Sequence, residues 1–267
     1  MVLRLLQTPP LDGPRNMALD EALLAHARRT GEVVVRAYTW ARPTLSLGRH
    51  QTARGVYSGE RAAAGGVDVV RRPTGGRAVL HARELTYSVT APPDTLGPSL
   101  RASYERINAL LADALAALGV RTAGARPAAR ARRPDGAPCF DAPAAGELVA
   151  GAEARKLVGS AQWREAGALL QHGSVLLADD QALLAGCAAG EIAPYDAPAT
   201  LAALLGRPVA AGEVAAALFD AARRLAADLG ARVAPGCDLD AINDPELAGD
   251  VARLLPRYQD PAWTWRR

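Results

Sequence analysis

Two residues of this chain, a lysine and a cysteine, have side chains suited to covalent chemistry. Lys156 is the only lysine of the chain, and Cys139 lies in the run Pro138-Cys139-Phe140-Asp141, seventeen residues earlier. A lysine ammonium is compact and its pKa responds to its surroundings, whereas a guanidinium is planar and permanently protonated. A nearby ammonium lowers the pKa of a thiol and so favours the nucleophilic thiolate. The pair predicts an activated cysteine, although a composition rich in Ala, Gly, Pro and Arg also fits a simple bias against lysine.

Two further segments carry residues that fit a ligand site. The first is Arg71-Arg72-Pro73-Thr74-Gly75-Gly76-Arg77, which continues through His81 to Glu84-Leu85-Thr86-Tyr87-Ser88. Adjacent glycines let a backbone approach a ligand closely and present its amides, but a lone Gly-Gly equally indicates a hairpin turn. The second segment runs from Lys156 to Arg164 and on through Gln171-His172-Gly173-Ser174.

Composition and charge narrow the class of protein. The net charge of +3, from 31 basic and 28 acidic residues, is too small for a typical nucleic-acid binder. It does not exclude acidic protein partners, which the basic run Arg121 to Arg133 would contact. Three cysteines, at 139, 187 and 237, have no spacing typical of a zinc site or a disulfide framework. No apolar run approaches the roughly 20 residues of a membrane span. We expect a cytoplasmic protein with no metal, no bound nucleic acid and no membrane contact.

The elements that must position these residues follow from hydrophobic periodicity and from Gly, Pro and capping signals. Helices are predicted at 16–29, capped by Asn16, and at 99–118, 180–187, 197–205, 213–229 and 245–255, the last ended by Pro256. Strands are predicted at 33–40, 44–48, 67–72, 78–81, 85–90, 147–149, 156–163 and 167–177, and 122–138 is predicted to be a surface loop. This pattern predicts an antiparallel or mixed sheet flanked by helices.

The ungapped run Arg-Arg-Pro-Thr-Gly-Gly-Arg, with the later Gly-Ser-Ala-Gln and Gln-His-Gly-Ser, resembles the biotin/lipoate protein ligase superfamily over about residues 14–178. The cysteine run resembles the cysteine loop of its LipM-type octanoyltransferases. The resemblance implies an α/β (α+β) fold with a mixed, largely antiparallel sheet, like the class II biotin and lipoyl synthetases. It also implies a single catalytic domain over residues 1–267, with a core at about 14–178 and a helical part at about 179–267.

The same resemblance implies an activity and its partners. Octanoyl-acyl carrier protein would acylate Cys139, with Lys156 lowering the thiol pKa, and the lysine of a lipoyl domain, on a glycine cleavage H protein or an E2 subunit, would then take the octanoyl group. No cofactor is implied. Residues around the acyl group and its carbonyl would be Arg71, Arg72, Thr74, Gly75, Gly76, His81, Gly159, Ser160, Gln162 and His172.

Other readings stay open at this stage. An ATP-dependent lipoate ligase would use Lys156 on an acyl-adenylate, an amidotransferase would move acyl groups between lipoyl domains, and a silent relative would only bind them. The chain also departs from the family at Ala82-Arg83, where an aspartate commonly follows the histidine, and its turn between Glu147 and Lys156 is about two residues longer. His81 and His172 also fit ordinary buried histidines, while Cys187 and Cys237 fit incidental thiols.

Overall fold

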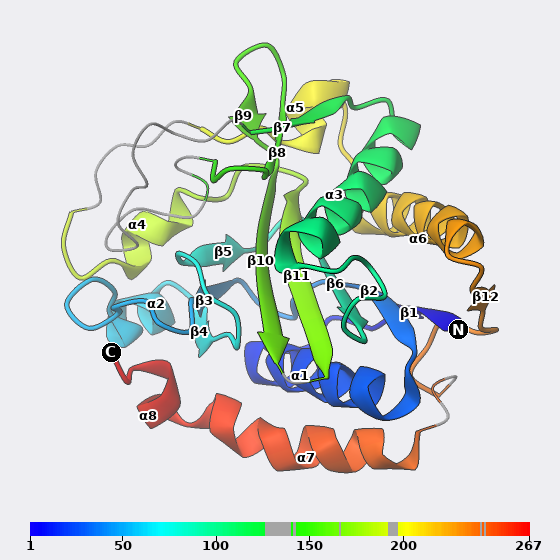
Figure 1. Ribbon diagram of the computed structural model, residues 1–267. Helices are drawn as coiled ribbons and strands as arrows, with labels where there is room; N and C mark the ends of the chain where they lie inside the picture. Colours follow the sequence, from blue (N-terminus) through cyan, green and yellow to red (C-terminus); the bar gives the residue numbers. More distant parts are fainter. Residues whose placement is uncertain (126–139, 141–142, 166, 192–196, 241, 243) are drawn as a thin grey trace.

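A computed structural model describes residues 1–125, 140, 143–165, 167–191, 197–240, 242 and 244–267. Its largest sheet has the strand order β10 (Val158–Glu165), β11 (Ala168–Leu176), β6 (Glu84–Ala91), β2 (Val33–Tyr38), β1 (Val2–Gln7) and β12 (Arg232–Val233). The pairs from β10 to β2 are antiparallel, whereas β1 pairs in parallel with both β2 and β12. The predicted fold class, a mixed and largely antiparallel sheet with helices around it, is confirmed (Figure 1).

Two small sheets stand beside the large one. The first has the order β4 (Asp68–Arg71), β3 (Thr44–Leu47) and β5 (Val79–His81), and the second has the order β7 (Thr122–Gly124), β8 (Leu148–Ala150) and β9 (Arg155–Lys156). Short helices complete these parts: α2 (Gly59–Ala64), α4 (Leu183–Cys187), α5 (Leu201–Leu205) and α8 (Pro261–Thr264). Both small sheets contribute residues to the cavity described below.

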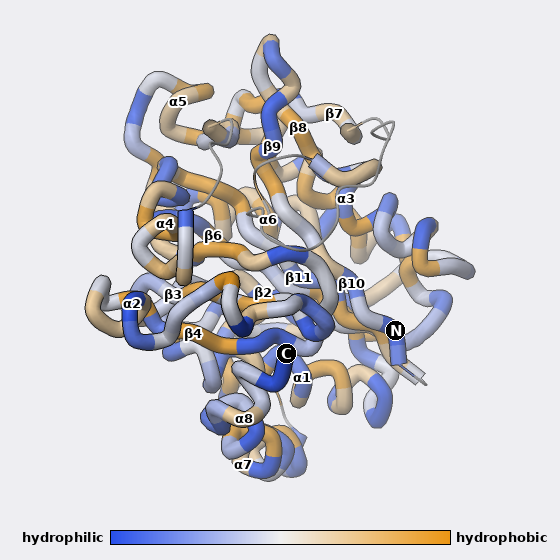
Figure 2. Tube along the Cα trace, turned by 90° about the vertical axis from the view of Figure 1, so that its left-hand side faces the viewer, coloured by the Kyte–Doolittle hydropathy of each residue, from blue (hydrophilic) through white to orange (hydrophobic). Residues whose placement is uncertain are grey.

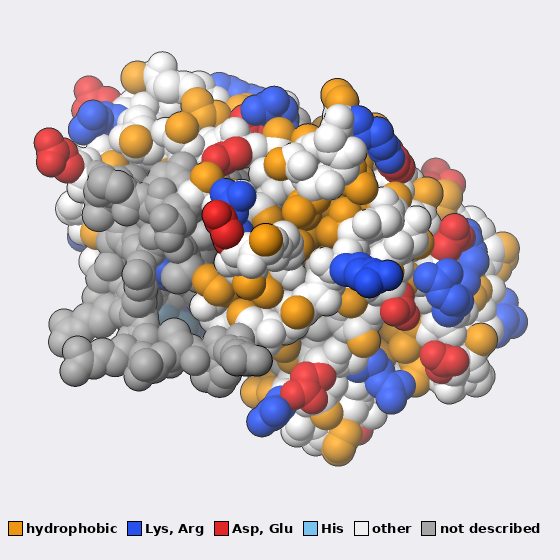
Figure 3. Space-filling view, turned by 90° about the horizontal axis from the view of Figure 1, so that it is seen from above, with side chains coloured by type: hydrophobic (Ala, Val, Ile, Leu, Met, Phe, Trp, Pro, Cys, Tyr) orange, Lys and Arg blue, Asp and Glu red, His pale blue; other side chains and the backbone are white. Residues whose placement is uncertain are grey.

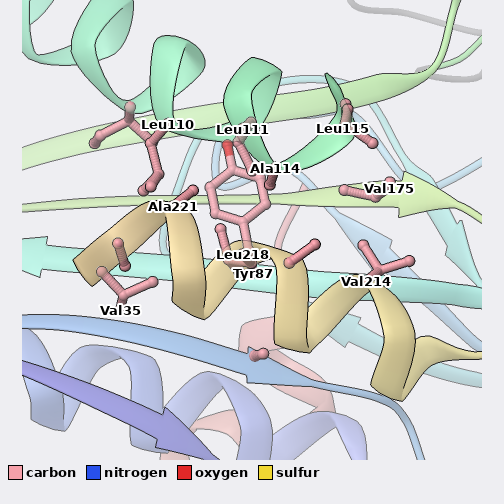
Figure 4. Close-up of a cluster of buried hydrophobic side chains, with 14 of the residues drawn as sticks. Val35, Tyr87, Leu110, Leu111, Ala114, Leu115, Val175, Val214, Leu218 and Ala221 are labelled. Atoms are coloured by element: carbon pink, nitrogen blue, oxygen red, sulfur yellow. The ribbon is translucent and has the colours of Figure 1, made fainter. Parts of the chain in front are cut away.

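Four long helices cover the two faces of the large sheet. Helices α3 (Leu100–Ala117) and α6 (Ala211–Asp228) pack on one face, and α1 (Gly13–Thr30) and α7 (Pro245–Gln259) lie on the other (Figure 1). Strand β2 shows why, because successive side chains of a strand point to opposite faces. Val33 and Val35 join the core under α3 and α6, where Figure 4 shows Val35. Val34 and Tyr38 join the core under α1 and α7.

The structure corrects several element boundaries. Asp12, not Asn16, caps α1: its carboxylate accepts the backbone N–H of Arg15 at 2.8 Å, and Pro14 in the first turn suits a helix start. Asn16 lies buried inside the helix. Pro256 does not end α7, which continues to Gln259, because this proline is on the exposed side of the helix and the carbonyl it leaves unpaired can face water.

Other elements were missing from the sequence prediction. Strand β1, α2, β12 and α8 were not predicted, and residues 122–124 form a strand where a loop was expected, while residues 126–138 of that loop lie outside the described part. The segment 156–163 is two strands rather than one, since β9 ends at Lys156 and β10 begins at Val158 in a different sheet. This change of sheet places Lys156 at the junction of the two.

Candidate active site

A cavity of about 280 Å³ opens between the large sheet and the two small ones. One part of its wall is apolar and includes Met17, Tyr38, Trp40 and Val79. The other lining residues are mostly of polar types and come from β3, the loop after β4, β5, β6, the segment before β8, and the strands β9, β10 and β11. Its volume lies just below the roughly 300–1,000 Å³ that small-molecule sites occupy. An apolar wall facing a polar one suits a ligand with an apolar chain and a reactive head group.

The polar wall is built around a buried ion pair. The ammonium of Lys156 lies 2.7 Å from the carboxylate of Glu147, and their side chains are 1% and 5% exposed. The Lys156 nitrogen also lies 5.1 Å from the ring centre of Phe140, which is buried against Val79 and Leu176. The predicted catalytic lysine therefore faces the cavity with a defined counter-ion.

Glu147 was missed as a site residue by the sequence reasoning, which placed it only at the start of a strand. Besides its contact with Lys156, its carboxylate accepts the backbone N–H of Ala144 at 2.7 Å and lies 3.4 Å from the backbone nitrogen of Ser160. A single carboxylate thus contacts the lysine, the segment that follows the cysteine run and the beginning of strand β10. One sequence signal could have identified Glu147 as a site residue. It is an acidic residue nine positions before the only lysine, at the other end of a predicted hairpin.

His172 is held by a buried network that reaches across the sheet. Its Nδ1 lies 2.9 Å from Asp20 on α1, and its Nε2 lies 2.6 Å from the hydroxyl of Thr74. Asp20 also accepts hydrogen bonds from Arg36 at 2.6 Å and from Tyr38 at 2.9 Å. Burial alone would raise the pKa of Asp20, but Arg36 and His172 outweigh it and hold that pKa below its usual value. The ionised carboxylate fixes the ring of His172 at the cavity wall.

His81 occupies a second polar cluster on the same wall. Its Nε2 lies 2.8 Å from Ser46, its Nδ1 lies 3.1 Å from Ser174, and the Trp40 ring stacks on it with 4.1 Å between ring centres. Burial lowers the pKa of His81, so the ring is neutral at pH 7. Glu84 lies 3.4 Å from Nδ1. A neutral imidazole between two hydroxyls is suited to orienting a polar group in the cavity.

Two glycines, Gly48 beside the Gly-Gly loop (Gly75-Gly76) and Gly173 on β11, lie where two backbones meet. A Cβ atom on Gly48 would lie 1.9 Å from the carbonyl oxygen of Gly76, and one on Gly173 would lie 2.1 Å from the carbonyl oxygen of Gly159. The carbonyls of Gly75 and Arg77 accept hydrogen bonds from Arg72, which holds the loop closed. The loop therefore forms a fixed edge of the cavity.

Most of the residues predicted from the sequence meet in this place. Lys156 and six of the ten predicted substrate residues line the cavity: Arg72, Gly76, His81, Gly159, Ser160 and His172. The other four are not among its described lining residues, and Thr74 instead supports His172. Gln162 bonds to Ser103 and Gln171, and Arg71 points to the C-terminal tail. Cys139 lies outside the described residues.

The chain is similar to known proteins along nearly its whole length. Residues 12–223 match the lipoyl protein ligase A/B catalytic domain. The chain is 40% identical to an octanoyltransferase LipM of Kyrpidia tusciae, with 99% of this chain and 98% of that protein covered. It is 41% identical to an octanoyltransferase LipM of Symbiobacterium thermophilum, over 87% of this chain and 88% of that one.

Solved structures show the same fold. A putative lipoate protein ligase from T. acidophilum with bound lipoic acid superposes with a TM-score of 0.79 at 20% identity, covering 99% of this chain and all of that one. A lipoate-protein ligase A bound with ATP gives a TM-score of 0.76 at 21% identity, covering 98% and 97%. Among the described helices, none is long and apolar enough to cross a membrane. The sequence resemblance is confirmed, and the chain belongs to the lipoyl protein ligase A/B catalytic domain family.

Proposed function

We propose that this chain is an octanoyltransferase that carries the acyl group on Cys139 between octanoyl-acyl carrier protein and a lipoyl-domain lysine. The octanoyltransferase class, predicted from the sequence, is confirmed by identities of 34–41% to octanoyltransferases LipM, two of them aligned over 98% or more of this chain. The donor, the acceptor and the covalent route are our proposal. The observation that carries the route is the buried Lys156, which contacts Phe140, the residue that directly follows Cys139 in sequence.

The proposed reaction has two acyl transfers. The Cys139 thiolate attacks the octanoyl thioester, a carbon–sulfur bond to Cys139 forms, the bond to the carrier sulfur breaks, and the carrier leaves as a thiolate that takes up a proton. The amine of the target lysine then attacks the new thioester, an amide forms, and the cysteine leaves as a thiolate while the amine loses a proton. Exchange between thioesters is nearly isoenergetic and amide formation is downhill, so no ATP is consumed.

The cavity residues have proposed roles in both steps. The Lys156 ammonium favours the thiolate over the thiol and stabilises negative charge that develops on the carbonyl oxygen. Glu147 positions that ammonium, and its bond to the Ala144 amide ties the segment that follows the cysteine run to the same carboxylate. The apolar side chains of Met17 and Trp40 receive the acyl chain. Each methylene that is buried there contributes about 0.8 kcal/mol to binding.

The test is intact mass spectrometry of the protein after incubation with octanoyl-carrier protein, with and without a lipoyl domain. We expect one octanoyl adduct without the acceptor, mapped to Cys139 and removed by hydroxylamine, and loss of the adduct when the acceptor is added. Cys139→Ala should form none. The matched control is the double variant Cys187→Ala/Cys237→Ala, which removes the two other thiols and should behave like wild type. An adduct that persists in Cys139→Ala refutes the covalent route.

The same assay separates the other functions. Strict need for ATP, magnesium and free octanoate would indicate a ligase. Transfer from an octanoylated lipoyl domain, but not from octanoyl-carrier protein, would indicate an amidotransferase. Binding of lipoyl domains without any transfer would indicate a silent relative.

A further inference from the structure

A basic surface lies where the C-terminal tail meets the loop after β3. We call it the arginine surface and define it by Arg49, His50, Arg54, Arg266 and Arg267. Figure 2 looks at this face, where the C-terminus lies beside β4 among hydrophilic stretches of the chain. Backbone bonds lock the two segments together: the main-chain oxygen of Arg267 accepts the N–H groups of Ala53 and Arg54 at 3.0 and 2.9 Å. The Arg266 guanidinium donates to the carbonyl of Arg49, and Arg54 donates to that of Trp265 at 2.5 Å.

These arginines are not neutralised by acidic side chains. Within the described part of the chain, no arginine of this surface forms an ion pair with an aspartate or glutamate, whereas the neighbouring Arg257 pairs with Glu21. His50 senses the excess of positive charge, since desolvation and the arginines around it, Arg267 and Arg49 first, lower its pKa. By contrast, Figure 3 shows basic and acidic side chains interspersed over the described part of another face.

Beneath the surface lies a buried arginine with the same lack of acidic partners. Arg71 is fully buried and donates only to backbone carbonyls, those of Thr264, Gly48 and Gln51, at 2.8, 2.5 and 2.8 Å. Its Nη2 atom and the Nε2 atom of Gln51 are buried without an acceptor among the described residues. Burial, followed by the charges of Arg266, Arg267 and Arg72, lowers the pKa of Arg71 to about 10. The unsatisfied donors beneath the arginine surface and the uncompensated charge on it together make this part of the protein electropositive, which favours an anion on the surface.

The arginine surface adjoins the catalytic cavity. The Arg49 backbone N–H donates to the carbonyl of Thr74 at 2.8 Å, and Gly48 packs directly on Gly76, which lines the cavity. The Arg49 guanidinium lies 5.0 Å from the ring centre of Trp163 on β10. An anion bound here would therefore be next to the loop whose other side faces the acyl group.

We propose that the arginine surface binds the acyl donor through the phosphodiester of its phosphopantetheine arm and the acidic face of its carrier protein. This inference rests on the proposed function, because it assigns the donor-binding surface of the same enzyme. Both protein partners can be acidic, but only the donor brings a phosphodiester, a group that guanidinium side chains bind well. The basic run Arg121 to Arg133 was the sequence-based expectation for such contacts, and its residues from 126 on lie outside the described part.

The experiment compares three donors with a lipoyl domain as acceptor: octanoyl-carrier protein, octanoyl-phosphopantetheine and octanoyl-pantetheine. The test variant is His50→Glu/Arg267→Glu, because both side chains are exposed. The matched control is Arg223→Glu/Arg224→Glu on α6, also exposed, which changes the net charge at least as much. Each is assayed at low and high salt, and the KM for the lipoyl domain is measured with octanoyl-pantetheine as donor.

We expect the test variant to raise the KM for octanoyl-carrier protein about tenfold at low salt, and to make it less sensitive to salt. The KM for octanoyl-phosphopantetheine should rise less, and the KM for the lipoyl domain should change little. The control should match wild type. Wild type should also use octanoyl-phosphopantetheine better than octanoyl-pantetheine, and equal use of the two would overturn the phosphate site.

Other outcomes identify which idea fails. A KM for octanoyl-carrier protein that is unchanged in the test variant overturns the docking surface and leaves the octanoyltransferase intact. An equal loss with all three donors, or a raised KM for the lipoyl domain alone, overturns it as well. Failure of wild type to transfer from octanoyl-carrier protein refutes the proposed function itself, and this is measured first.

Discussion

Removing Lys156 should destabilise the protein as well as stop acyl transfer, because the lysine compensates a buried carboxylate. In Lys156→Ala, Glu147, whose side chain is 5% exposed in the intact pair, keeps only two backbone N–H groups near it, those of Ala144 and Ser160. Breaking a buried pair by removing one partner costs about 3–5 kcal/mol. In a chain of this size that corresponds to a fall in Tm of roughly 10 °C.

The informative control is the double variant Lys156→Met/Glu147→Gln. It removes both charges, keeps the length of residue 147, shortens residue 156 by one atom and leaves an amide oxygen to accept the Ala144 N–H. We expect its free energy of unfolding in urea to lie within about 1 kcal/mol of wild type, since a buried ion pair and a neutral pair of similar volume are often equivalent. Octanoyl transfer should still be lost.

A third variant separates charge from shape. Lys156→Arg keeps the positive charge, so the pairing with Glu147 and most of the stability should remain. Transfer should fall sharply, because a planar fork replaces a compact ammonium in a closed site. Two results would refute this reasoning: Lys156→Ala with wild-type stability, or the neutral double variant with wild-type transfer. Full activity in Lys156→Arg would mean that charge alone suffices.

Two further predictions concern the acyl pocket and the acid stability. Shortening the donor acyl chain from eight carbons to six should lower kcat/KM about fifteenfold, because two methylenes contribute about 1.6 kcal/mol, and equal rates for both chains would contradict an apolar acyl pocket. Burial alone would raise the pKa of Asp244, but hydrogen bonds from His26 and Arg29 outweigh it and lower that pKa from 3.8 to about 2. The ionised Asp244 therefore stabilises the folded protein fully above about pH 4, and this stabilisation is lost as the pH falls towards 2. Asp244→Asn should lower the free energy of unfolding at pH 7 by on the order of 1 kcal/mol and flatten the decline between pH 4 and pH 2, measured by urea unfolding at each pH.

The sequence predicted the elements that have strong local signals. Helix α3 was found because its leucines repeat with helical spacing and Ser99 caps it, and β6 because β-branched and aromatic residues form one run. Strand β1 was missed, although it is central enough to pair with both β2 and β12, because its pattern in Leu-Arg-Leu-Leu also fits a helix. His26 contacts Asp244 at 2.7 Å, a partner 218 residues away that no local sequence pattern indicates.

The same limit explains which parts of the site could be predicted. The motif residues Arg72, Gly76 and His172 were identified because the family pattern places them in short contiguous runs. Glu147 and Asp20 were not, since their roles depend on contacts made only after the chain folds. The prediction of one domain over residues 1–267 and the role of Cys139 stay predictions.

The buried network around Asp20 shows how the fold holds the site together. Asp20 on α1 contacts Arg36 on β2 and His172 on β11, and His172 in turn contacts the loop residue Thr74. Four segments from distant parts of the sequence thus meet through charged or strongly polar groups rather than through interchangeable aliphatic contacts. Because hydrogen bonds to an ionised group have strict geometry, this network fixes the Gly-Gly loop relative to β11 more closely than packing alone. The loop is shared by the acyl cavity and the arginine surface, so one rigid element sets the distance between the proposed acyl-transfer site and the proposed phosphate site.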